Sequence, residues 1–140
     1  MSSLHLSYKV IAGDMGRAGE ASSAVKQALK KMGFDSTTIR RVSVCMYEGE
    51  INMVIHANGG TAEVDVDLDD ITITLKDTGP GIPDVGKAMQ EGFSTACEHA
   101  RNLGFGAGMG LPNMKKYSDQ MTVDSTVGVG TTVTMVIHVA

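Results

Sequence analysis

Three short runs in this sequence carry residue types that could do chemistry. Glu48 and Asn52 place a carboxylate and an amide four residues apart. Residues 77–82 begin with an aspartate and continue as a glycine-containing turn after a strand-like stretch. Residues 104–110 have glycine at every second position. Together the runs could supply a proton acceptor, an oxygen ligand for a cation, and backbone N–H groups that bind phosphate.

The first run is predicted to lie on a helix, where a spacing of four residues puts Glu48 and Asn52 on one face. Asn52 could offer its side-chain oxygen to Mg²⁺, a hard cation that takes oxygen ligands and substrate phosphates. Glu48 could accept a proton from an attacking hydroxyl group or water. Glu50 is a competing carboxylate, but at two residues from Glu48 it points elsewhere on the helix. The alternative is a surface helix whose polar side chains are simply hydrated.

The second run places Asp77 at the end of a strand. An ionised carboxylate only accepts hydrogen bonds, and the exocyclic amine of adenine is a fitting donor. Gly79 and Gly81 would let the backbone approach a ring closely, and Ile82, which closes the run, is also a candidate nucleotide contact. The run Gly130-Thr131-Thr132, at the start of a later strand, carries a hydroxyl that could help hold the adenine side. The alternatives are an ordinary aspartate turn and a threonine that reflects strand propensity.

The third run opens onto a helix, where free backbone N–H groups favour anionic phosphate. Its candidate phosphate contacts are Gly106, Gly108, Met109 and Gly110. The spacing matches neither the dinucleotide-binding pattern Gly-x-Gly-x-x-Gly nor the P-loop pattern, so both of those sites are excluded on this segment. A flexible loop is the alternative. Taken together, the three runs predict an ATP site.

Bulk properties restrict the class of protein. The 140 residues fit one domain with a real core. The net charge is −4, and Lys and Arg cluster only in pairs, which argues against nucleic acid as the main partner. No apolar run approaches the ~20 residues that span a bilayer, and no signal sequence is visible. Two cysteines, Cys45 and Cys97, make no disulfide framework, so we expect a cytoplasmic protein.

Periodicity predicts the elements that position these runs. The order is not the alternating strand and helix of a doubly wound sheet. Neighbouring strands instead predict an α/β fold of the α+β two-layer type, a mixed, mostly antiparallel sheet with helices on one face. The expected helices are 18–32, 37–56, a short one at 85–90, and 111–117, and the expected strands are 5–11, 62–68, 71–76, 121–125 and 131–139.

The order of the motifs, on a helix, a strand end and a helix start, resembles the GHKL ATPase superfamily, the Bergerat-fold proteins that include gyrase and histidine kinases. The short layout is closest to bacterial anti-sigma regulatory factor serine/threonine kinases, and the resemblance covers nearly the whole of residues 1–140. It implies an N box in which Asn52 coordinates Mg²⁺ and Glu48 is the catalytic base. It also implies an ATP lid over residues 84–108. The remaining positions that match its motifs are Asp77, Gly79 and Gly81 at adenine, Gly106, Gly108 and Gly110 at the phosphates, and Thr132 supporting Asp77.

The resemblance implies an ATP-binding regulatory protein with ATP and Mg²⁺ as cofactors. The expected activity is that of an anti-sigma-factor-type serine/threonine protein kinase in transcription regulation, acting on a partner protein that is an antagonist or a sigma-factor-like regulator. One alternative is an ATP-gated switch that sequesters a regulator without phosphoryl transfer. Another is the catalytic part of a split histidine kinase. Homodimerisation is plausible for this family.

Overall fold

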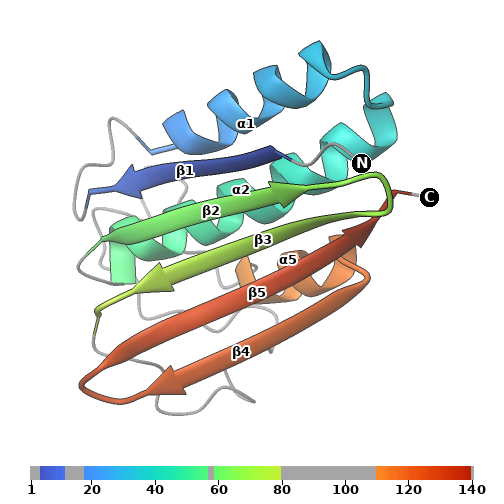
Figure 1. The fold of residues 1–140 in the computed structure, drawn as a ribbon. Coiled ribbons are helices and arrows are strands. Elements are labelled where there is room, and N and C mark those ends of the chain that lie inside the picture. The colour runs from blue at the N-terminus through green and yellow to red at the C-terminus, as the bar shows by residue number, and fades with distance from the viewer. Residues whose placement is uncertain (1–3, 12–17, 57–58, 80–109, 140) are drawn as a thin grey trace.

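The computed structural model describes residues 4–11, 18–56, 59–79 and 110–139 (Figure 1). Over these residues five strands form one sheet in the order β1-β2-β3-β5-β4. Every pairing is antiparallel, so the expected mixed sheet is purely antiparallel here. The elements are β1 (Leu4–Val10), α1 (Glu20–Lys31), α2 (Ser36–His56), β2 (Gly60–Val66), β3 (Asp70–Asp77), α5 (Gly110–Tyr117), β4 (Gln120–Thr126) and β5 (Gly130–His138).

These elements confirm the expected order, and every bound lies within two residues of its predicted position. The short helix at 85–90 and the lid at 84–108 fall outside the described residues. None of the described helices is long and apolar enough to cross a membrane.

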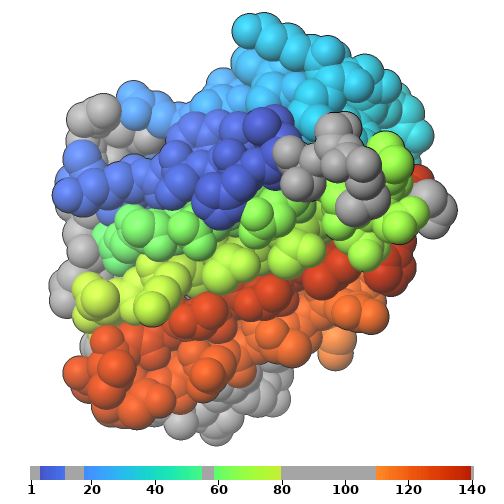
Figure 2. Space-filling view, in the orientation of Figure 1, coloured from blue at the N-terminus to red at the C-terminus, as the bar shows by residue number. Residues whose placement is uncertain are grey.

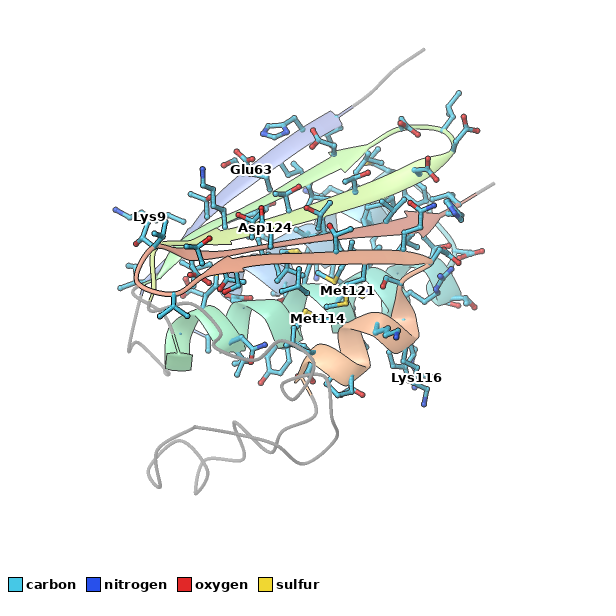
Figure 3. All side chains as sticks on the ribbon, turned by 90° about the horizontal axis from the view of Figure 1, so that it is seen from below. Lys9, Glu63, Met114, Lys116, Met121 and Asp124 are labelled. Carbon is cyan, nitrogen blue, oxygen red and sulfur yellow. The ribbon has the colours of Figure 1, made fainter. Side chains whose placement is uncertain are left out.

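The fold has two layers, with α1, α2 and α5 on one face of the sheet (Figures 1 and 3). Along each strand apolar side chains alternate with polar ones, because successive residues point to opposite faces. Figure 3 shows Met114 and Met121 between the layers, and Lys9, Glu63 and Asp124 on the opposite face. Figure 2 views that open face, over which the strands lie side by side. The largest fully buried side chains are Leu29, Met46, Ile71, Ile73, Met114, Met135 and Ile137.

Gly49 is a point of close approach between α2 and the sheet. A Cβ atom at this position would lie 1.9 Å from Cδ1 of Leu75 and 3.5 Å from Sδ of Met114. Glycine therefore lets α2 pack against β3 and α5 together. Glu48 precedes Gly49 and Leu75 lies two residues before Asp77, so this contact joins the two elements that carry these candidate site residues.

Gly49→Ala should lower the free energy of unfolding by about 1–3 kcal/mol, the usual cost of overpacking a core. Helix propensity alone would make the alanine variant more stable by about 1 kcal/mol. A lower free energy of unfolding in urea would therefore show that the new methyl group clashes with its neighbours. The control is Leu75→Val, which shortens the facing side chain. In the Leu75→Val protein, Gly49→Ala should lower the free energy of unfolding by less. An equal decrease in both proteins would contradict the contact between Gly49 and Leu75.

Candidate functional site

The start of α5 lies directly against the predicted cation ligand on α2. A Cβ atom at Gly110 would be 3.1 Å from both Oδ1 and Nδ2 of Asn52. A side chain at position 110 would therefore crowd the amide of Asn52. The first N–H groups of a helix have no partner within the helix, so this start can accept an anionic group beside Asn52.

One turn further along α5, Asn113 reaches the predicted base. Its Nδ2 donates to Oε1 of Glu48 at 3.4 Å, and both side chains are partly buried. Glu48 and Asn52 therefore face α5, as their spacing of four residues predicts. The structure thus brings Glu48, Asn52 and Gly110 together from two segments that are far apart in the sequence.

Asp77 ends β3 at the same edge of the molecule as the start of β5. Its Oδ1 accepts hydrogen bonds from the backbone N–H groups of Gly79, at 2.9 Å, and Thr131, at 3.1 Å. Two amide donors on one oxygen hold the carboxylate in a single orientation. The side chain is partly buried and the backbone of Gly79 is buried, so this turn is anchored on the protein side.

Thr132 does not support Asp77, and this expectation is corrected by the strand register. Thr132 is paired with Lys76, and both side chains point to the open face of the sheet. The residue beside Asp77 is Thr131, which is 7% exposed and faces the helices. Its backbone N–H binds Asp77, and its hydroxyl pairs with the Ser125 hydroxyl at 2.8 Å. A shift of one residue along a strand exchanges the two faces.

Two further glycines at the strand ends were missed by sequence reasoning. A Cβ atom at Gly130 would lie 2.2 Å from the carbonyl oxygen of Asp77, and its φ of 151° is unfavourable for other residues. A Cβ atom at Gly60 would lie 2.1 Å from the carbonyl oxygen of Lys76. Neighbouring strands thus approach the end of β3 more closely than a side chain allows. The Gly-Thr pair that opens β5 was the available signal for this contact.

Glu50 has a structural place, away from Glu48. Its side chain is 3% exposed and accepts from the backbone N–H groups of Ala21 and Ser22, at 3.1 and 3.0 Å, and from the Ser22 hydroxyl at 2.7 Å. Helix α1 begins after Gly19, which has no side chain to cap it. Glu50 therefore caps α1 from the neighbouring helix. The expectation that it points away from Glu48 is consistent with this arrangement.

Five candidate residues lie outside the described part of the chain. They are Gly81, Ile82, Gly106, Gly108 and Met109. Among the described residues, Glu48, Asn52, Asp77, Gly79 and Gly110 remain as candidates at the helix-covered side of the molecule. This set contains the Asp77 carboxylate at a strand end, and the Glu48 carboxylate, the Asn52 amide and a helix start at the α2–α5 contact. A nucleotide and its cation would need groups of these kinds.

Comparison with known proteins identifies the class that this fold and site define. The chain belongs to the histidine kinase-like ATPase domain family, which matches residues 11–137. It is 31% identical over 110 residues to the serine/threonine-protein kinase RsbT of Bacillus subtilis, covering 76% of this chain and 77% of that protein. It is 37% identical over 102 residues to an anti-sigma F factor of Caldanaerobacter subterraneus, covering 69% and 68%.

Solved structures agree with this fold. The chain is similar to the RsbU and RsbW domains of a Mycobacterium tuberculosis protein, with a TM-score of 0.59 at 15% identity. That match covers 98% of this chain and about a third, 32%, of the solved one. It is also similar to the mycobacterial sensor histidine kinase MprB, with a TM-score of 0.54, 16% identity, and coverage of 96% and 97%. The family match and the curated relatives together make the chain an ATPase domain related to serine/threonine kinases.

Proposed function

We propose that this chain is a serine/threonine protein kinase that binds ATP and Mg²⁺ and phosphorylates a partner regulator protein. The observation that carries the proposal is the contact between α2 and the start of α5. It gathers a carboxylate, an amide oxygen and a helix N-terminus, with Asn113 only 3.4 Å from Glu48. The relatives support the same activity, since they include a serine/threonine-protein kinase and anti-sigma F factors.

Asp77 would select the base of the nucleotide. Oδ1 is already bound by two backbone N–H groups, so we assign Oδ2 to the exocyclic amine of adenine. A carboxylate cannot donate, and it therefore disfavours a base that presents a carbonyl oxygen at this position. Because Thr131 and Gly79 already orient the carboxylate, little conformational entropy is lost at this side chain when adenine binds.

The phosphates would lie at the start of α5, with Asn52 placed to give its Oδ1 to Mg²⁺. The cation, when bound with ATP, would neutralise charge that develops on the transferred phosphoryl group. Glu48 would take the proton from the serine or threonine hydroxyl of the partner as the hydroxyl oxygen bonds to the γ-phosphorus of ATP and ADP leaves. Its position next to Asn52 on one helix face puts the proton acceptor beside the phosphates rather than beside adenine.

Glu48→Gln should lower the rate of phosphoryl transfer by about 10²–10⁴-fold, the usual contribution of a general base. ATP binding should change little, because glutamine keeps the shape and one acceptor oxygen. The assay follows radiolabel from the γ-phosphate of ATP into proteins of an extract from the source organism, and calorimetry measures ATP binding. Glu63→Gln, which lies on the open face of the sheet, is the matched control.

Wild-type transfer rates in Glu48→Gln would refute the assignment of the base. A wild-type protein that retains a partner only with ATP, yet transfers no label, would instead support an ATP-gated switch. Label that is stable to alkali but labile to acid would indicate phosphohistidine, and would favour the catalytic part of a split histidine kinase.

A further inference from the structure

Helix α5 lies antiparallel along α2, and a series of contacts joins them from end to end. Gly110 meets Asn52, and Asn113 meets Glu48. In the middle, the Cys45 thiol donates to the carbonyl oxygen of Met114 at 3.6 Å. Ascending numbers on α5 meet descending numbers on α2, and the last of these contacts is that of Tyr117 with Arg41.

The far end of α5 is tied to α2 by a charged side chain. Nε of Arg41 donates to the carbonyl oxygen of Tyr117 at 3.2 Å, and its guanidinium donates to Oδ2 of Asp119 at 2.7 Å. Asp119 also accepts from the backbone N–H of His138 at 2.7 Å, and these two bonds keep the pKa of its carboxyl below the usual value. The end of α5 is therefore fixed to α2 and to β5 at once. Sliding of α5 along α2 would break these bonds.

The middle of the contact between α2 and α5 is fully buried. Met114 and Cys45 have no exposed surface, and burial raises the pKa of the Cys45 thiol to about 12. A thiol with that pKa stays neutral, so it serves as a packing group. The separation of Asn113 from Glu48 is consequently set by the packing of two helices on each other. This is a more rigid support than a loop would provide.

We propose that Asn113 is a positioning residue that holds the carboxylate of Glu48, an inference that rests on the proposed function of Glu48 as base. The Asn113 amide donates to Oε1, which leaves Oε2 to receive the proton of the attacking hydroxyl. An amide has no acidic proton of its own, so it orients the base without competing for the proton. The 3.4 Å separation is at the long end for a hydrogen bond, as catalytic contacts often are before substrate binds.

The first test replaces the donor. Asn113→Leu removes the donor and puts an apolar side chain of similar size in its place, and should lower kcat for phosphoryl transfer by about 10- to 100-fold, which corresponds to one hydrogen bond to a charged group. KM for ATP should stay within about twofold, because adenine and the phosphates are bound by other groups. Asn113→Gln retains a donor that can reach Glu48 and should recover most of the loss. Lys115→Leu, an exposed change on the same helix, is the control.

The second test asks whether Asn113 acts through Glu48. In a Glu48→Gln background, Asn113→Leu should cause no further loss, because the carboxylate that it orients is already absent. Full additivity of the two losses would overturn the proposal. A rise in KM for ATP without a fall in kcat would overturn it as well, because that pattern indicates a role in binding.

A third readout does not depend on activity. The side-chain NH₂ resonances of Asn113 in a ¹⁵N NMR spectrum should move when Glu48 is replaced by glutamine. Unmoved resonances would overturn the pairing whatever the kinetics show. If the resonances move but Glu48→Gln transfers phosphate at the wild-type rate, the pairing is real but Glu48 is not the base, and the positioning role of Asn113 fails with that assignment. The two failures are therefore distinguishable.

Discussion

Asp77→Asn should weaken ATP binding by about 100-fold or more while leaving the protein folded. Asparagine keeps Oδ1, so it can still accept from the N–H groups of Gly79 and Thr131 and hold the turn. Its NH₂ group would replace Oδ2 and would point a donor at the amine of adenine. The site would lose a charge-assisted hydrogen bond, and two donors would face each other without an acceptor. Calorimetry with Mg²⁺ measures the loss, and an unchanged unfolding midpoint in urea confirms that the turn survives.

A comparison of two nucleotides that differ in their nucleobase provides an internal control for Asp77→Asn. Inosine triphosphate carries a carbonyl oxygen where ATP carries the amine, so the asparagine NH₂ could donate to it. The wild type should prefer ATP, and Asp77→Asn should narrow or reverse that preference. Equal weakening of both nucleotides would argue that Asp77 acts only through the fold. Tight ATP binding by the variant would show that another group reads the amine.

Glu50→Ala should lower the free energy of unfolding by about 3 kcal/mol or more. The substitution leaves the buried N–H groups of Ala21 and Ser22 and the Ser22 hydroxyl without their acceptor, and each such orphan costs about 1–3 kcal/mol. Helix α1 would also lose a negative charge at its N-terminus, where the helix dipole favours one. The thermal midpoint should fall by roughly 10 °C, a shift that circular dichroism detects readily.

Glu50→Gln separates capping from simple loss of volume. Glutamine restores one acceptor oxygen but turns an NH₂ group toward the donors of α1, so its stability should fall between wild type and Glu50→Ala. Glu63→Ala, a partly exposed glutamate on the open face, should change stability by well under 1 kcal/mol. If Glu50→Ala unfolds at the same midpoint as the wild type, the carboxylate does not stabilise α1.

The sequence by itself predicted the elements, because their signals are local. The alternation of Ile71, Ile73 and Leu75 with polar residues defines a half-buried strand wherever it lies. Antiparallel neighbours followed from the short connections between predicted strands. The spacing of Glu48 and Asn52 also predicted a shared helix face, and that face meets α5 in the structure. Each of these features depends on residues within a few positions of one another.

Only the tertiary structure decided which side chains meet. Thr131 and Thr132 are adjacent and have the same side chain, and the strand register turns Thr131 to the helix-covered face, where its backbone N–H binds the carboxylate of Asp77. Glu50 differs from Glu48 by two positions, yet it caps a helix that begins 30 residues earlier, at Glu20. Asn113 touches Glu48 across 65 residues of sequence. Such contacts arise from the packing of helices on a sheet, and no local pattern records the partner that a side chain will find.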